Sequence, residues 1–134
     1  MVSCYLDVSH CLFGHVLLVC LLYQQLRHGA SRVYGIEAEL AGDGDIVIDM
    51  LERNQADYYD MILMDIQMPV MNGYDAAKKI RRMDDPQKAG IPIVAMTANA
   101  FSEDKQAALD AGMNDHIAKP INMNVLVPTI RKYL

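Results

Sequence analysis

The sequence has no concentrated positive charge. Its 134 residues include 12 lysines and arginines against 17 aspartates and glutamates, which gives a formal net charge of −5. The basic residues form only short groups, at Lys78–Lys79, Arg81–Arg82 and Arg131–Lys132. A nucleic-acid-binding surface requires clustered lysine and arginine. The composition therefore argues against nucleic acid as a partner and predicts that these bases lie on solvated helix faces.

A run of apolar residues long enough to cross a membrane is also missing. The stretch from Leu12 to Tyr23 is apolar apart from Gly14 and His15, but a membrane-spanning helix needs about 20 residues. The start of the chain also lacks the basic segment and the small-residue cleavage site of a signal peptide. We therefore expect a cytoplasmic protein without a membrane partner, in which this stretch is a buried strand leading into a helix. A short membrane-interacting segment is the alternative.

Cysteine is too sparse and too irregular to predict a disulfide framework. The chain has three cysteines, all within its first twenty residues, and this odd count favours reduced thiols in the cytosol. Histidines lie in the same region, but the Cys-x-x-Cys and His-x-x-x-His spacings of a metal site do not occur. A Cys/His metal site in this region is kept as an alternative, with the candidate ligands Cys4, Cys11, Cys20, His10, His15 and His28.

The sequence does contain five segments with the pattern of buried or half-buried strands. Apolar residues make up 52% of the chain and charged residues 22%, as is usual for a globular domain. The expected strands alternate with amphipathic helices. This alternation predicts an α/β fold with a doubly wound parallel sheet and helices on both faces. The predicted strands are His15–Cys20, Ile36–Ala41, Met61–Asp65, Ile91–Met96 and His116–Ala118.

Turn-forming and capping residues predict further boundaries. Asp84–Gly90 is expected to be a loop between a basic helix over Tyr74–Met83 and the next strand. Asn124 is expected to cap the final helix. Pro128 lies within that helix and would remove one of its backbone hydrogen bonds.

Three chemically useful side chains lie at the ends of predicted strands. Asp65 follows the apolar run Met61–Met64, Thr97 follows the fourth strand, and Lys119 follows the fifth. The carboxyl ends of parallel strands meet at one edge of the sheet, where open α/β sheets bind ligands. We therefore expect these residues to converge. An aspartate can act as a nucleophile on phosphorus, and a lysine and a hydroxyl can stabilise the charge of a phosphoryl group.

Three ordered segments resemble the receiver domain of response regulators. Met64–Gly73 matches the phosphoacceptor pattern Asp-x-x-Met-Pro-x-Met-Asp/Asn-Gly at every specified position. Pro92–Ala98 resembles the fourth strand of the family and Ala111–Pro120 resembles its fifth strand. The segments are most similar to receivers of hybrid sensor histidine kinases. The resemblance covers Gly35–Leu134 and implies a flavodoxin-like (βα)5 fold with the strand order 2-1-3-4-5.

The resemblance implies a function in two-component or phosphorelay signal transduction. Asp65 would accept a phosphoryl group from a phosphohistidine and become an aspartyl phosphate. Asp65 and the backbone carbonyl of Gln67 would be ligands of Mg²⁺. Thr97 and Lys119 would bind the phosphoryl group, and Thr97 and His116 would change conformation as the switch. Such a domain promotes its own phosphorylation and is not an enzyme in the usual sense.

The implied partner is a histidine kinase or a histidine phosphotransfer domain. The face built from the helix after Ser102, the strand His116–Ala118 and the final helix would be the output surface, and it could also form a homodimer. The sequence shows no DNA-binding or catalytic output domain. The chain is therefore expected to be either a stand-alone regulator or a piece of a hybrid kinase.

The family also has an acidic pair directly after its first strand, and both acids serve the metal ion. Here the sequence reads Val19-Cys20-Leu21-Leu22 and supplies no carboxylate. We expect one receiver domain over residues 1–134 whose first part, 1–34, is atypical. Degeneration, a shifted reading frame or a misplaced gene start would each explain this. An alternative alignment makes Val2–Leu6 the first strand and recovers one acid, Asp7.

The missing acids leave other functions open. Each lost stabiliser of phosphoryl transfer could cost roughly 10²–10³ in rate. The chain would then be a degenerate pseudo-receiver that acts as a phosphorylation-independent protein-interaction module. A flavin- or nucleotide-binding protein would share the sheet order, but it requires a phosphate-binding loop after the first strand. Leu21-Leu22-Tyr23 offers no such loop.

Overall fold

A five-stranded parallel sheet forms the centre of the structure. The computed structural model describes residues 14–19, 36–68, 70–98 and 102–134. The sheet has the order β2-β1-β3-β4-β5, and every neighbouring pair of strands is parallel. This is the predicted flavodoxin-like order, so the fold class is confirmed. The strands are β1 (Gly14–Val19), β2 (Ile36–Ala41), β3 (Met61–Asp65), β4 (Ile93–Thr97) and β5 (Asp115–Ala118).

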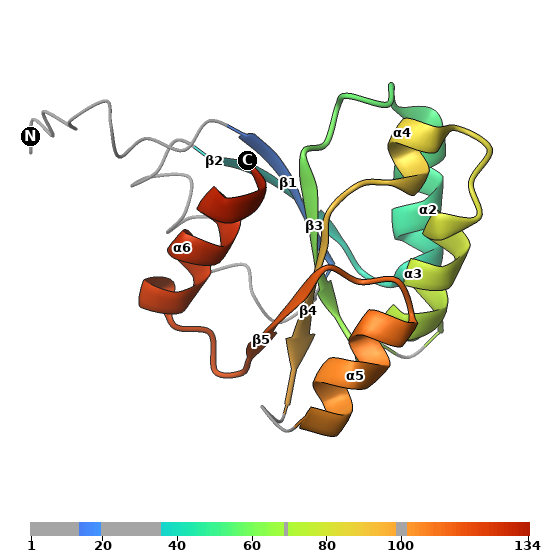
Figure 1. Ribbon diagram of the computed structural model, residues 1–134. Helices are drawn as coiled ribbons and strands as arrows, with labels where there is room; N and C mark the ends of the chain where they lie inside the picture. Colours follow the sequence, from blue (N-terminus) through green and yellow to red (C-terminus); the bar gives the residue numbers. More distant parts are fainter. Residues whose placement is uncertain (1–13, 20–35, 69, 99–101) are drawn as a thin grey trace, which may run out of the picture.

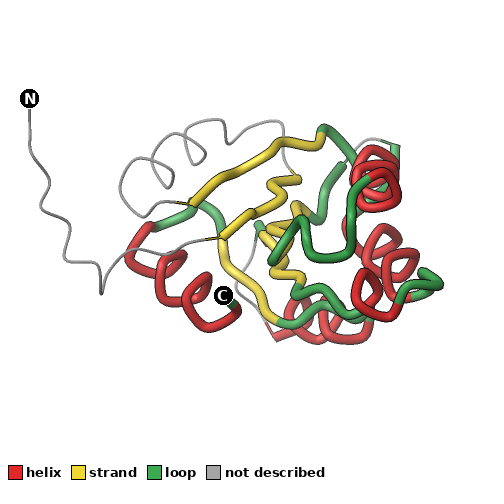
Figure 2. The backbone as a smooth tube through the Cα atoms, turned by 90° about the horizontal axis from the view of Figure 1, so that it is seen from above, coloured by secondary structure: helices red, strands yellow, loops and turns green. Residues whose placement is uncertain are grey.

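Helices cover both faces of this sheet. One side carries α2 (Gly44–Arg53), α3 (Gly73–Arg81), α4 (Pro86–Ala89) and α5 (Ser102–Asp110), and the other side carries α6 (Met123–Tyr133) (Figure 1). Seen from above, the strands lie between these two groups (Figure 2). Within the described ranges, none of the helices is long and apolar enough to span a bilayer.

Burial on both faces explains why β3 is an unbroken apolar run. Successive side chains of a strand point to opposite faces. Met61 and Leu63 belong to the core cluster beneath α6, whereas Ile62 and Met64 belong to the cluster beneath α2 and α3. All residues of β3 are buried. A charged residue that is buried on this strand needs polar partners. The charged residue of β3 is Asp65, and it is the last residue of the strand, where the sheet meets the loops.

Two boundaries near β4 differ from the prediction. The expected loop Asp84–Gly90 contains α4, because the Asp85 side chain accepts hydrogen bonds from two backbone N–H groups of the first turn and Pro86 suits a first helical position. β4 starts at Ile93 rather than Ile91. The Ile91 carbonyl accepts a hydrogen bond from the Arg81 side chain instead of joining the sheet.

The final helix starts earlier than predicted. Its cap is Asn122, whose side-chain oxygen accepts the backbone N–H of Asn124 at 2.8 Å. Asn124 itself lies in the first turn, so the predicted cap is wrong by two residues. Pro128 lies inside the helix and is exposed. It leaves the helical carbonyl four residues earlier without its usual donor, and the helix nevertheless continues to Tyr133.

Candidate functional site

Asp65 is a buried carboxylate at the carboxyl end of the central strand. It is the last residue of β3 and is only 4% exposed. β3 lies between β1 and β4, and Asp65 pairs in register with Met96. The Oδ1 atom of Asp65 accepts a hydrogen bond from the backbone N–H of Gln67 at 3.1 Å. This bond folds the following loop back over the carboxylate.

Lys119 reaches Asp65 from two strands away. It follows β5, and its backbone N–H donates to the Thr97 carbonyl at 2.7 Å. Its Nζ atom lies 2.8 Å from Asp65 Oδ1, and the two side chains are 22% and 6% exposed. The peptide bond between Lys119 and Pro120 is cis. A charge-assisted bond of this length at a largely buried carboxylate is a strong polar contact of the described site.

Thr97 completes the convergence that the sequence predicted. It is the last residue of β4 and is 2% exposed. Strand β4 lies between β3 and β5 in the sheet order, so Thr97 is next to the strand that carries Asp65. The structure thus brings Asp65, Thr97, Lys119 and the backbone of Gln67 to one edge of the sheet, as expected from the parallel topology.

Gly73 allows helix α3 to start against the end of β3. Its backbone N–H donates to the Ile66 carbonyl at 2.9 Å. A Cβ atom at this position would overlap the backbone carbonyl oxygen of Asp65 and lie 3.0 Å from the Ile66 Cα. Only glycine fits this close approach without moving the backbone that holds Asp65. The preceding residue, Asn72, caps α3 by accepting the Asp75 N–H at 2.9 Å.

His116, the predicted switch residue, lies on β5 in register with Ala95. Its side chain is 22% exposed. Its Nδ1 atom is buried and has no hydrogen-bond partner among the described residues. The Oδ1 atom of Asp115 lies 3.9 Å from it, beyond hydrogen-bonding distance. The side chain therefore has an unmet polar atom, which is unusual for a buried group.

The residues at this edge do not make a complete magnesium site of the expected kind. Asp65 supplies a carboxylate and Gln67 a backbone carbonyl, which are ligands that Mg²⁺ accepts. No cluster of three metal-binding side chains occurs in the part of the chain that the structure describes. β1 ends at Val19, which pairs with Met64. The predicted place of the missing acids, from Cys20 onward, lies outside the described residues, but the sequence has no Asp or Glu between positions 8 and 36.

Two side chains beside this site were not predicted from the sequence. Tyr74 in the first turn of α3 and Asp104 in the first turn of α5 line a pocket of about 110 Å³, together with Ile66, Gln67, Thr97 and Ala98. Burial, and the nearby charge of Asp104, raise the pKa of the Tyr74 phenol above its usual value. Residues on separate helices give no sequence pattern that reveals such a pocket.

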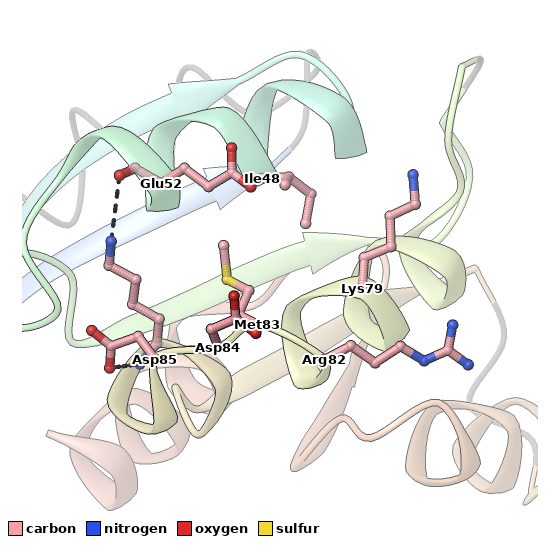
Figure 3. Close-up of a pocket in the computed structure, with 8 residues that line it drawn as sticks. Ile48, Glu52, Lys79, Arg82, Met83, Asp84 and Asp85 are labelled. Carbon is pink, nitrogen blue, oxygen red and sulfur yellow. Dashed lines mark hydrogen bonds between the residues drawn. The ribbon is translucent and has the colours of Figure 1, made fainter.

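A wider groove of about 550 Å³ lies away from the strand ends, between α2, α3 and α4 (Figure 3). Ile48 and Met83 point into it. Lys88 also lines it and donates to the Glu52 carbonyl at 3.4 Å. Its charged lining residues are of both signs: Glu52, Lys79, Arg82, Asp84, Asp85 and Lys88. The groove shares no lining residue with the Asp65 edge.

The class of protein that the fold defines is a flavodoxin-like α/β domain, with a buried aspartate at the end of β3 that a lysine after β5 contacts. Residues 20–131 match the family described as the response regulator receiver domain. The chain belongs to this family, which functions in two-component and phosphorelay signalling.

Curated relatives are histidine kinases. The chain is 37% identical over 129 residues to probable histidine kinase 2 of Oryza sativa, with 87% of this chain and 12% of that protein covered. It is 50% identical over 72 residues to histidine kinase 1 of Arabidopsis thaliana, with 54% of this chain and 6% of that protein covered. The chain thus spans only about an eighth of the rice kinase.

Solved structures of similar fold are receiver domains. The receiver of sensor histidine kinase PA1611 from Pseudomonas aeruginosa, with magnesium in its active site cleft, is 34% identical (TM-score 0.76; 91% of this chain and 98% of that chain covered). The receiver of Ssk1 from Saccharomyces cerevisiae, crystallised with the phosphotransfer protein Ypd1, is 30% identical (TM-score 0.77; 91% and 90%). These matches confirm the resemblance that the three sequence segments predicted.

Proposed function

We propose that Asp65 is the phosphoacceptor of this receiver domain and takes a phosphoryl group from a phosphohistidine. The observation that supports it most is the 2.8 Å contact between Lys119 Nζ and Asp65 Oδ1 across two strand positions. In the transfer, a carboxylate oxygen of Asp65 attacks phosphorus, the P–N bond breaks, and the aspartyl phosphate forms.

Lys119 and Thr97 have separate tasks in this proposal. Lys119 neutralises negative charge, first on the Asp65 carboxylate and then on the phosphoryl oxygens. Thr97, which is 2% exposed at the end of the neighbouring strand, donates its hydroxyl hydrogen to a phosphoryl oxygen. The sheet holds the backbone of both residues near Asp65 before the phosphoryl group arrives. Only movements of the two side chains are then needed to bring them to the phosphoryl oxygens.

Mg²⁺ is retained in the proposal only as a weakly held ion at Asp65 and the Gln67 carbonyl. A receiver relative binds magnesium in its active site cleft, but the carboxylates available here are too few for the same ligand set. We therefore assign no step of the transfer to the metal ion. Lys119 carries the charge compensation instead.

We infer the partner and the output by analogy with the family. By analogy with the Ypd1–Ssk1 pair, the donor is a histidine phosphotransfer domain or a histidine kinase domain. We propose that Thr97 and His116 form the switch, and that α5, β5 and α6 form the output face, through which a homodimer could assemble. We further propose a cytoplasmic location and one receiver domain over residues 1–134, which is either a stand-alone regulator or a piece of a hybrid kinase.

A pseudo-receiver is the second candidate function. The absence of any Asp or Glu between positions 8 and 36 favours it, because phosphoryl transfer in the family relies on carboxylate-bound metal. In this case the same fold would present its output face without being phosphorylated.

Phosphorylation by a small phosphodonor separates the two candidates. The chain is incubated with acetyl phosphate, with Mg²⁺ or with a chelator, and the modified residue is located by mass spectrometry. We expect an adduct on Asp65 that is lost in Asp65→Asn and kept in Asp57→Asn, which alters an exposed carboxylate. No adduct on Asp65, under conditions that phosphorylate another receiver, would reject the first function and support the second.

A further inference from the structure

The small pocket next to Thr97 opens beside the place where the phosphoryl group would sit. Thr97 and Ala98 come from the end of β4, Gln67 from the loop after Asp65, and Tyr74 and Asp104 from two helices. Its volume of about 110 Å³ lies well below the ~300–1,000 Å³ of pockets that hold drug-sized ligands. The pocket is therefore of a size for one small ring.

The two sides of this pocket differ in chemical character. Asp104 is a half-buried carboxylate, and Tyr74 supplies an aromatic ring whose phenol pKa is raised by burial and by the charge of Asp104. One wall thus carries a negative charge and an aromatic surface. The opposite side leads to Thr97, which belongs to the phosphoryl site. A group that fits must be small, flat and able to donate a hydrogen bond to a carboxylate.

We propose that Tyr74 and Asp104 form the binding slot for the imidazole ring of the phosphohistidine donor. This inference rests on the proposed function of Asp65 as acceptor and adds the residues that select the donor. The ring packs against Tyr74, and its nitrogen that carries no phosphoryl group donates its hydrogen to the Asp104 carboxylate. Asp104 is a positioning residue, since it touches the donor ring and not the transferred group.

In this arrangement the bonds, the electron pair and the ring proton of the transfer step are all accounted for. The donor ring enters protonated on the free nitrogen, so it carries a positive charge beside its phosphoryl group. Asp65 oxygen bonds to phosphorus, the P–N bond breaks, and its electron pair stays on the ring nitrogen. The ring leaves as neutral imidazole and keeps its hydrogen on the nitrogen that faces Asp104. A carboxylate at this place favours the protonated donor, which has the better leaving group.

The same carboxylate should discriminate between phosphodonors. It attracts a protonated imidazole ring, but it gives no such contact to acetyl phosphate, whose leaving group is itself a carboxylate. A structural role of Asp104 as a favourable acid in the first turn of α5 would not depend on the donor. Glu103 lies in the same turn and is exposed outside the pocket. It therefore provides a matched control.

Rates of phosphorylation with two donors test the slot. With phosphoimidazole, Asp104→Asn should react about tenfold more slowly than the unaltered chain, as expected for loss of a charge-assisted hydrogen bond. With acetyl phosphate it should react at an unchanged or higher rate. Glu103→Gln should leave both rates unchanged. Equal effects of Asp104→Asn on both donors, or no effect on either, would overturn the proposal.

Binding of imidazole alone tests the slot without phosphorylation. The ¹⁵N-labelled chain is titrated with imidazole at roughly pH 6, where a ring with a histidine-like pKa of ~6.5 is mostly protonated. Amide signals of Tyr74, Ala98 and Asp104 should shift, and Asp104→Asn should weaken the binding while Glu103→Gln should not. If Asp65 is not phosphorylated but imidazole binds in this way, the proposed function fails and the slot stands. If phosphorylation occurs but these signals do not respond, the slot is rejected and the acceptor role stands.

Discussion

Two cations lie at opposite ends of the same sheet and are held in opposite ways. Lys119, at the carboxyl end, contacts one oxygen of the buried Asp65 carboxylate at 2.8 Å. Arg81, at the end of α3, is half-buried and makes hydrogen bonds of 2.6–2.8 Å to neutral acceptors. Burial lowers the pKa of Arg81 from its usual value. The acceptors of Arg81 are the carbonyls of Gly112, Ala89 and Ile91 and the Asn114 side chain.

The hydrogen bonds of Arg81 are fixed by the fold, whereas the contact of Lys119 with Asp65 can change. The acceptors of Arg81 belong to the segments before β4 and β5, so its planar guanidinium ties α3 to both strands in one geometry. The carboxylate that Lys119 contacts would itself become an acyl phosphate in the proposed transfer. The lysine can then follow the negative charge to the phosphoryl group. We infer that Arg81 maintains the fold and that Lys119 serves the chemistry.

The largest expected effect is on the rate of Asp65 phosphorylation when Lys119 is replaced. Lys119→Gln removes the positive charge that faces the phosphoryl group, and the rate of Asp65 phosphorylation should fall by roughly 10²–10³. The rate is measured with acetyl phosphate by following the intact mass. Lys78→Gln, at an exposed lysine of α3, is the control and should react normally. An unchanged rate in Lys119→Gln would remove the distinction between the two cations.

Arg81→Lys should have the opposite effect to Lys119→Gln: the protein should become less stable but should still be phosphorylated. A lysine presents one compact ammonium group and cannot reach every acceptor that the guanidinium fork now satisfies, so buried carbonyls lose their donors. The free energy of unfolding should fall by about 2–3 kcal/mol, as for other unsatisfied buried polar groups. Urea unfolding measures this, and the folded variant should still be phosphorylated. Arg82→Lys changes the exposed neighbouring arginine and should cost little. A stable Arg81→Lys variant with slow phosphorylation would contradict the comparison.

Gly73→Ala should affect stability and chemistry together. The added Cβ overlaps the carbonyl oxygen of Asp65, so the end of β3 or the start of α3 must shift. Overpacking of this kind costs about 1–3 kcal/mol, and the shift moves Asp65 relative to Lys119. Urea unfolding and the phosphorylation rate are measured on the same variant. In Gly90→Ala the Cβ would come 3.2 Å from the Pro86 carbonyl, so only a small loss of stability and a normal rate are expected there.

The residues at the carboxyl edge of the sheet could be predicted from the sequence, because the prediction needs few assumptions. Buried parallel strands have characteristic apolar runs, and their carboxyl ends share one edge. Asp65, Thr97 and Lys119 each stand at or just after such a run. The order of the strands came from the resemblance to receivers. Periodicity alone does not give that order.

The missed features depend on distances that a sequence does not contain. The Tyr74–Asp104 pocket arises because the first turns of α3 and α5 lie on either side of the end of β4. The sequence predicts that Arg81 and its neighbouring bases lie on a solvated helix face, and only the fold shows that Arg81 is half-buried. The cap of α6 was assigned to Asn124, although Asn122 is an equally good capping residue two positions earlier.

The smallest expected effect concerns Tyr59, which lies just before β3 and donates a hydrogen bond to Glu39. Burial, the hydrogen bond to Glu39 and the charge of Glu39 raise the pKa of the Tyr59 phenol well above 10. Above pH ~10 the unfolded chain loses this proton while the folded chain keeps it. Unfolding then releases a proton, and the free energy of unfolding falls as pH rises.

Tyr59→Phe should therefore make stability less dependent on pH above ~10, while lowering it at neutral pH by about 1 kcal/mol through loss of one hydrogen bond. Urea unfolding at a series of pH values between roughly 8 and 11 measures the slope. Some slope should persist, because the pKa values of Tyr74 and Tyr133 are also raised. Tyr58→Phe removes the other tyrosine hydrogen bond to Glu39 but keeps the Tyr59 phenol and its contact with Glu39, so it should keep most of the slope of the unaltered chain. An equal slope in Tyr59→Phe would show that the contact with Glu39 does not hold this phenol in its protonated form.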